Sequence, residues 1–170
     1  MSTTLAPLTP EPGPRPRPRA WHPASPRHLV LHVATGHGIE FIDVTDRVRA
    51  FVTAADVRTG LVTIQSLHTT LAVVVNEHEP LLLADFVRQL ERWAPSDGRY
   101  AHDDPTRRRV NLMPGERVNG HAHCRALALS ASVSLCVVDG DLLLGRWQRV
   151  FVVELDGAQS RRVALTVVGG

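Results

Sequence analysis

Lysine is absent from this chain of 170 residues, so all nineteen basic side chains are arginines. The absence excludes mechanisms that depend on a lysine, such as Schiff-base catalysis and phosphate binding by a Walker-type loop. Aromatic residues are also scarce, at 5% of the chain, and arginines in the first 27 residues account for the net charge of +2. Because surfaces that bind nucleic acids combine basic and aromatic side chains, we expect no nucleic-acid partner.

Long apolar runs are absent as well. The apolar stretches fall far short of the roughly 20 residues that span a bilayer, so we expect no membrane partner. The N-terminal region has prolines and arginines where a secretory signal needs about 7–15 apolar residues, which predicts a cytoplasmic protein. Two cysteines, Cys124 and Cys136, are too few for a disulfide framework. Their apolar neighbours predict small buried side chains in a reducing compartment.

The chain divides into a tail and one domain. Most of its twelve prolines lie within residues 5–26, beside Arg15, Arg17 and Arg19. A segment with so little apolar surface cannot offset the entropy of ordering, so residues 1–26 are predicted to be a disordered tail. The Pro-Arg alternation is also compatible with a docking peptide for an aromatic groove. With 44% hydrophobic residues in the chain, residues 27–170 are predicted to form a single domain.

The hydrophobic pattern is mainly that of short strands. Apolar spacing indicates three short helices, one after Asp43 or Thr45, one over residues 79–93 and one around 121–129. Residues 94–118 are polar and turn-rich and are interpreted as a long loop. The strands of the last forty residues, with Asp139-Gly140 as a turn, are predicted to form an antiparallel meander. The predicted class is α+β and β-rich, an antiparallel β-sandwich-like core with two or three helices. The predicted strands lie near residues 28–34, 39–44, 61–67, 71–75, 133–138, 142–144, 150–155 and 162–168.

Three polar clusters interrupt this apolar framework. They are residues 66–70 with the Asn76-Glu77 pair, residues 100–104 and residues 119–123, and they hold four of the nine histidines. Imidazoles beside carboxylates suit a divalent metal or general acid–base catalysis near neutral pH. For any single histidine, a hydrogen-bonded structural role is an equally open interpretation. On a helix, His121 and His123 would point about 200° apart, so only one of the two rings would face a common centre.

Two further features have two interpretations each. In Gly145-Arg146-Trp147-Gln148, the glycine and tryptophan fit a strand bulge with a core aromatic, or Gln148 contacts a ligand beside Trp147. The Arg161-Arg162 pair either clamps a phosphate or is solvated.

Taken in order, the motifs of this chain resemble the YjbQ family from His28 to the C-terminus. The resemblance implies a compact, β-sandwich-like α+β fold, a homotrimer, a polar pocket that could hold a metal, and a weak or secondary thiamine-phosphate synthase activity. The chain departs from the family pattern at Arg146, where a threonine is usual, and at Cys124, where an aliphatic residue is usual. The motifs that carry the resemblance are His68-Thr69-Thr70, Asn76-Glu77, Tyr100-x-His102-Asp103-Asp104, Asn119-x-His121-x-His123, Asp139-Gly140, Gly145-x-Trp147-Gln148, Asp156-Gly157 and Arg161-Arg162.

The activity implied by the resemblance joins a thiazole phosphate to a pyrimidine diphosphate and releases pyrophosphate. The alternative is a trimeric protein that binds a metal or a small phosphorylated metabolite without thiamine chemistry. A divalent metal, Mg²⁺ or Zn²⁺, is expected at His68, His102 and His123, one histidine from each cluster. The expected catalytic residues are His68, His123, Asp103 and Glu77, and the expected substrate-binding residues are Thr69, Thr70, Asn76, Asn119, Trp147, Gln148 and Arg162.

Overall fold

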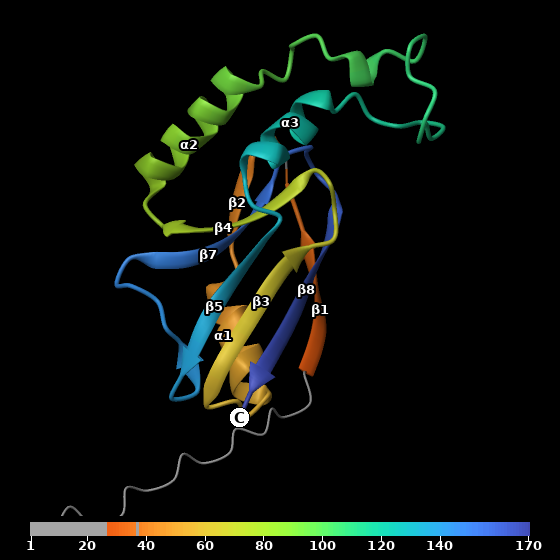
Figure 1. Cartoon of the computed structure of the whole chain (residues 1–170). Helices are drawn as coiled ribbons and strands as arrows, with labels where there is room; N and C mark the ends of the chain where they lie inside the picture. The colour runs from red at the N-terminus through yellow and green to blue at the C-terminus, as the bar shows by residue number, and fades with distance from the viewer. Residues whose placement is uncertain (1–26, 37) are drawn as a thin grey trace, which may run out of the picture.

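The computed structural model describes residues 27–36 and 38–170, so the predicted tail, residues 1–26, lies outside the described residues. Within these described residues, eight strands form two antiparallel sheets, accompanied by three α-helices (Figure 1). This confirms the predicted β-rich α+β class. The first sheet has the order β1 (Arg27–Ala34), β8 (Ser160–Gly169), β3 (Thr59–Ser66), β5 (Ser132–Val138) and β6 (Asp141–Leu142), and the second has the order β2 (Glu40–Asp43), β7 (Gln148–Glu154) and β4 (Leu71–Glu77).

Alternation along the strands divides the apolar side chains between two cores. On β7, Val150 and Val152 pack in the main core between the sheets, while Phe151 and Val153 face a smaller second core. Neighbouring strand residues point to opposite faces, so β7 is buried on both sides. Helix α1 (Thr45–Ala54) closes the main core, and α2 (Pro80–Trp93) and α3 (Gly120–Ala128) contact the second.

The predicted meander of the last forty residues is wrong beyond its first turn. The Asp139-Gly140 turn joins β5 to β6, and both residues have positive φ, 52° and 85°, as a tight hairpin requires. Strand β7 instead crosses to the other sheet, between β2 and β4, and β8 returns to lie between β1 and β3. A central strand needs two partners, and here both partners of each strand come from distant parts of the chain.

Side chains outside the helices fix where two of the helices begin. The carboxylate of Asp43 accepts hydrogen bonds from the Thr45 N–H at 2.9 Å and the Thr45 hydroxyl at 2.6 Å, at the start of α1. Glu79 accepts the N–H groups of Leu81 and Leu82 at 2.9 and 2.7 Å at the start of α2. Since a first-turn N–H has no partner within its own helix, these bonds stabilise the N-termini of α1 and α2. The structure confirms the three predicted helices, and the bounds of α2 and α3 lie within one residue of the predicted ranges.

The expectation of two buried cysteines is wrong for Cys136. Its side chain is exposed, whereas Cys124 is half-buried. On β5 the apolar residues Leu135 and Val137 face inward, so the alternation of the strand places Cys136 on the outer face.

Figure 1 shows α3 and the long loop before it at one end of the sheets, with the C-terminus at the other end. A short 3-10 helix, η1 (Ala101–Asp103), interrupts that loop. Within the part of the chain that the structure describes, no helix is long and apolar enough to span a membrane.

Candidate functional site

Residues from each of the three polar clusters line one cavity at the α3 end of the sheets. The cavity has a volume of about 500 Å³. The turn between β3 and β4, the long loop, the first turns of α3 and the connection between β7 and β8 each contribute to its wall. Among the polar residues that line it are His68, Thr69, Thr70, His102, Arg108, Glu116, Asn119, His123, Asp156, Gln159 and Arg161.

His102 and His123 lie against each other in this cavity. Their ring centroids are 4.6 Å apart and the rings meet edge to face at 61°. Arg108 Nη1 lies 3.2 Å from His102 Nε2 and 2.9 Å from a Glu116 oxygen. Because a guanidinium group only donates hydrogen bonds, His102 Nε2 is the acceptor.

The imidazole ring of His123 has no hydrogen-bond partner among the described residues, although its backbone N–H donates to the Asn119 carbonyl at 3.2 Å. Burial is the main cause that lowers its pKa from the ordinary value, followed by the neighbouring His102 ring. His123 is therefore a neutral imidazole near pH 7, with a ring nitrogen able to take up a proton.

His68 lines the same cavity but is bound to the backbone. Its Nε2 accepts the N–H of Arg162 at 2.8 Å. Burial lowers its pKa most, and the charges of Arg161 and Arg162 lower it further. Both effects disfavour a charged ring.

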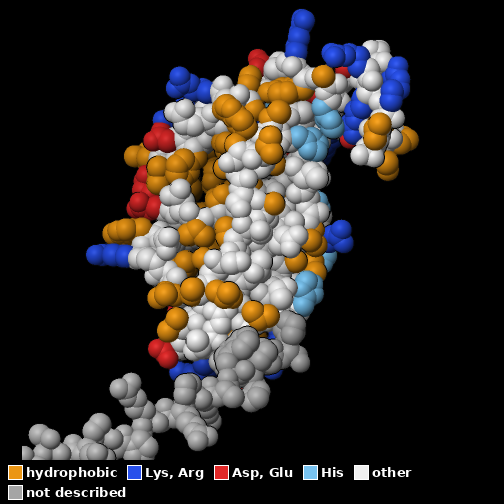
Figure 2. All heavy atoms as spheres, viewed as in Figure 1, with side chains coloured by type: hydrophobic (Ala, Val, Ile, Leu, Met, Phe, Trp, Pro, Cys, Tyr) orange, Lys and Arg blue, Asp and Glu red, His pale blue; other side chains and the backbone are white. Residues whose placement is uncertain are grey.

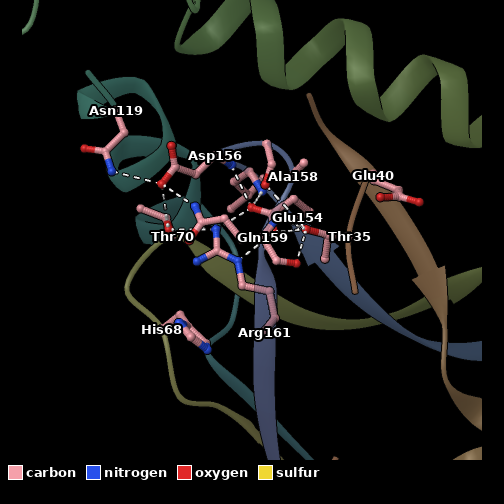
Figure 3. A network of polar contacts seen from close by, with 12 residues as sticks. Thr35, Glu40, His68, Thr70, Asn119, Glu154, Asp156, Ala158, Gln159 and Arg161 are labelled. Atoms are coloured by element: carbon pink, nitrogen blue, oxygen red, sulfur yellow. Dashed lines mark hydrogen bonds and ion pairs between the residues drawn. The ribbon is translucent and has the colours of Figure 1, made fainter. Parts of the chain in front are cut away.

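A buried ion pair lies beneath the cavity (Figure 3). Arg161 Nε and Nη2 donate to the two oxygens of Glu154 at 2.6 and 2.5 Å, and the residues are 2% and 0% exposed. The carboxylate also accepts the Thr35 hydroxyl at 2.8 Å and the Leu155 N–H at 2.9 Å. Burial raises the pKa of Glu154, but hydrogen bonds from Arg161 and the Asp156 N–H outweigh it and lower the pKa. Glu154 therefore remains charged and holds the guanidinium group in place.

A hydrogen-bond network continues from this pair across the cavity floor (Figure 3). Thr70 accepts from Arg161 Nη2 at 3.1 Å and donates to Asp156 at 3.4 Å. The same Asp156 oxygen accepts the side-chain amides of Asn119 and Gln159, both at 3.0 Å. Asn119 is 8% exposed, and its Oδ1 is buried without a hydrogen-bond partner among the described residues. Since a buried acceptor without a partner is costly, Asn119 Oδ1 is a position where a ligand donor would be stabilised.

Asp103, expected to be catalytic, lies beside the N-terminus of α3. Its Oδ1 accepts the N–H of Asn119 at 3.1 Å and of Gly120 at 2.9 Å. A Cβ at position 120 would come within 2.4 Å of Tyr100 Cβ, so only glycine allows this close approach. The geometry gives Asp103 a capping contact with the helix.

Four of the expected site residues lie away from the cavity. Asn76 and Glu77 end β4, which begins next to Thr70, and a strand of that length places them about 20 Å further along. Gln148 pairs with Glu77 across the sheet, and Trp147 is 60% exposed with Arg146 stacked 4.6 Å from its ring. The structure therefore does not bring these residues to the histidines.

The arginine that faces the cavity is Arg161, whereas the expected one was Arg162. Arg162 is exposed, and it reaches His68 only through its backbone N–H. Neighbouring strand residues point to opposite faces, so an error of one residue in the register of β8 exchanges the faces on which Arg161 and Arg162 lie. Asp156, Gln159 and Glu154 were missed as well, and only the Asp156-Gly157 turn motif could have indicated them.

The arrangement does not fit the expected metal set. Among the described residues, no group of three or more His, Cys, Asp or Glu side chains is placed to hold a metal ion. Nε2 of His68 and of His102 each accept a hydrogen bond, so the neutral rings carry their proton on Nδ1 and neither nitrogen has a lone pair free for a metal. His123 alone among the three has both ring nitrogens without a partner in the described chain.

Exposed arginines lie on the loop that contributes Arg108 to the cavity. The loop carries Arg107 and Arg109, both exposed, on either side of Arg108. Figure 2 shows arginine side chains gathered on this loop, next to histidine side chains. Positive charge gathered on this loop attracts anions.

Comparison with known proteins agrees with the fold and the motifs. The family model described as "UPF0047 protein YjbQ-like" matches residues 30–170. This chain belongs to the YjbQ family. The resemblance inferred from the motifs is thus confirmed at the level of the family.

Several relatives can be aligned with about four fifths of this YjbQ-family chain. The UPF0047 protein of Methanothermobacter thermautotrophicus is 34% identical over 82% of this chain and 90% of its own length. That of Archaeoglobus fulgidus is 38% identical over 79% of this chain and 96% of its own length. Among solved structures, a "YbjQ-like protein of unknown function" from Sulfolobus solfataricus superposes with a TM-score of 0.77 at 29% identity, covering 88% of this chain and all of that one. The names of these relatives state no activity.

Proposed function

We propose that this YjbQ-family protein binds a small phosphorylated metabolite in the histidine-lined cavity and moves a proton through His123. The observation that carries the proposal is that three distant segments place His68, His102 and His123 around one cavity. The His123 ring is neutral near pH 7 and has no hydrogen-bond partner within the described chain, which leaves it free to take up a proton and pass it on. The cavity volume of about 500 Å³ suits a small metabolite.

The reaction implied by the resemblance is the joining of a thiazole phosphate to a pyrimidine diphosphate. A carbon–nitrogen bond forms at the thiazole nitrogen, the bond from the pyrimidine methylene to the diphosphate oxygen breaks, and the electron pair leaves with pyrophosphate. Because the thiazole nitrogen has no proton to lose, His123 would take up a proton from water and pass it to the leaving pyrophosphate. The step needs positive charge near the leaving group. The exposed Arg107 and Arg109, on the loop beside the cavity, would supply it together with Arg161, because Arg108 is already paired with Glu116.

The test is formation of thiamine phosphate by purified protein from the two substrates, with and without Mg²⁺. We expect His123→Ala to lower turnover by about 100-fold or more, the range of a lost general acid–base group. His28→Ala is the matched control, because His28 is exposed on β1 and pairs with Thr166 of β8, further along that strand than the cavity-lining Arg161. Absence of turnover in the wild type, or equal turnover in His123→Ala, would contradict the proposal.

The second candidate is binding of a phosphorylated metabolite without thiamine chemistry. It is favoured by the hydrogen bonds that already occupy His68 and His102, which leave one histidine of three for chemistry. Thermal-shift measurements with phosphorylated ligands, together with elemental analysis of protein purified without chelator, test it. Ligand-dependent stabilisation without turnover supports this candidate, and no stabilisation together with no stoichiometric metal rejects it.

A further inference from the structure

We propose that His68 and Arg161 form an oxyanion subsite in the cavity, in which His68 is a fixed neutral donor through its Nδ1–H. The inference rests on the proposed function, since the oxyanion would be the phosphate group of the bound metabolite. It assigns to His68 a role other than metal ligand or acid–base group.

The backbone determines which nitrogen of His68 carries the proton. Arg162 N–H lies 2.8 Å from His68 Nε2, and a backbone N–H can only donate. Nε2 must therefore be unprotonated, so the neutral ring carries its proton on Nδ1. Protonation of Nε2 would set two N–H groups against each other.

The end of β3 explains why the ring takes this position. Leu67 N–H still donates to the Arg162 carbonyl at 3.2 Å, as in a continuing strand. The chain then turns, and the Ser66 hydroxyl, which binds the N–H and carbonyl of His68 at 3.1 and 2.9 Å, holds the turn. Arg162 N–H thus loses its next strand partner, and the His68 ring replaces the missing carbonyl. The Ser66 hydroxyl therefore holds the backbone of His68, and the Arg162 N–H holds its ring.

Arg161 completes the subsite. Its Nε and Nη2 are occupied by Glu154 and Thr70, whereas Nη1 has no partner among the described residues. Arg161 and His68 both line the cavity, and Figure 3 shows the His68 ring beside the Arg161 side chain. Two N–H groups on Nη1 and one on His68 are therefore available to an acceptor.

The local charge favours an anion as that acceptor. The positive charges of Arg161 and Arg162 act more strongly on His68 than the negative charge of Glu154 does. A positive potential beside a neutral donor stabilises a phosphate oxygen and repels a metal cation.

Two isosteric variants separate the two nitrogens of His68. In His68→Asn the side-chain amide nitrogen occupies the position of Nδ1, and in His68→Gln the amide occupies the position of Nε2. With inorganic phosphate as the probe in isothermal titration calorimetry, we expect His68→Asn to stay within a few-fold of the wild type. His68→Gln should bind phosphate about 10-fold more weakly or worse, as for the loss of a hydrogen bond to a charged group. No phosphate binding by the wild type, or equal affinity in both variants, overturns the subsite.

A second measurement needs no ligand and stays informative if a variant fails to fold. ¹⁵N NMR of the His68 ring should show a protonated Nδ1 and an unprotonated Nε2 across neutral pH, and the opposite tautomer overturns the inference. The outcomes also separate the two proposals. Turnover that depends on His123 with the opposite tautomer at His68 rejects only the subsite. Phosphate binding that depends on His68 without turnover in the two-substrate assay rejects only the thiamine chemistry.

Discussion

The histidines around the cavity differ in what their ring nitrogens contact, and the contacts separate their roles. His68 is bound to a backbone N–H and His102 to Arg108, whereas His123 has no such partner among the described residues. The roles inferred here follow from these hydrogen bonds, and the number of histidines alone could not have distinguished them.

Half-buried neutral histidines also predict a pH-dependent stability. Burial lowers the pKa values of His68, His121 and His123 below the ordinary 6.5, and unfolding restores that value. Between the folded pKa values and about 6.5 the unfolded chain binds more protons, so the stability is present above that range and lost as pH falls through it. We expect Tm to decrease from about pH 7 to about pH 5, measured by thermal unfolding.

The matched variant for this prediction is His121→Leu. His121 packs against Tyr100, and its Nδ1 is buried without a partner among the described residues. The variant should show a shallower decrease of Tm with falling pH. A wild-type Tm that stays constant over this pH range would show that the histidines have the same pKa values in the folded and unfolded chain, which contradicts the prediction.

Removing one partner of the Arg161–Glu154 pair should be strongly destabilising. In Arg161→Met the Glu154 carboxylate, 0% exposed, loses its counter-charge, and the expected cost is about 3–5 kcal/mol. Arg162→Met is the control, because its side chain is exposed, and it should change stability by no more than about 0.5 kcal/mol. Urea unfolding measures both. Similar losses in the two variants would mean that the buried pair is not the cause, and the double variant Arg161→Met/Glu154→Leu should recover part of the loss.

At the level of elements, variants of Asp103 distinguish a structural role in capping α3 from a catalytic role. Asp103→Ala removes the acceptor of two helix N–H groups and should cost about 1 kcal/mol. Asp103→Asn keeps an oxygen at that position and should be close to the wild type in stability. Chemical denaturation and the turnover assay are compared for both variants. A loss of turnover in Asp103→Asn at unchanged stability would instead indicate the catalytic role expected from the sequence.

Strand β4 explains why the family motifs separate into two groups. It begins beside the cavity at Leu71 and ends at Glu77, next to Gln148 of β7. One rigid strand cannot place both of its ends at the same site. The motifs at Asn76-Glu77 and Trp147-Gln148 therefore belong to a different surface of the same chain.

At the level of the whole molecule, exposed apolar side chains suit contact with a partner, and the family resemblance implies that this partner is the same chain in a homotrimer. Leu81, Leu143 and Trp147 are 76%, 63% and 60% exposed, and α2 has an apolar stripe but no fully buried residue. Surfaces of this kind are usually covered by a partner. We expect light scattering at micromolar concentration to give three times the chain mass of 18.7 kDa. A mass equal to one chain would contradict the trimer.

Much of the local structure could be predicted because its causes are local. Apolar spacing placed α2 over residues 79–93, and the structure has it at Pro80–Trp93 with Glu79 as its cap. The Asp139-Gly140 turn was predicted from residue types that tolerate positive φ. The pairing of β7 and β8 could not be predicted, because each strand takes its partners from distant segments and no local pattern specifies them.

The sequence by itself determined the family, the β-rich class and the three polar clusters, since these depend on residue types and short spacings. Only the tertiary structure decided which members of the clusters share a cavity. A strand has two faces, and the pairing of β8 with β1 and β3 is what directs Arg161 inward and Arg162 outward. The same pairing sets the Arg162 N–H against the His68 ring. The protonation of that histidine thus depends on a backbone group 94 residues away in the chain, a distance over which sequence spacing carries no information.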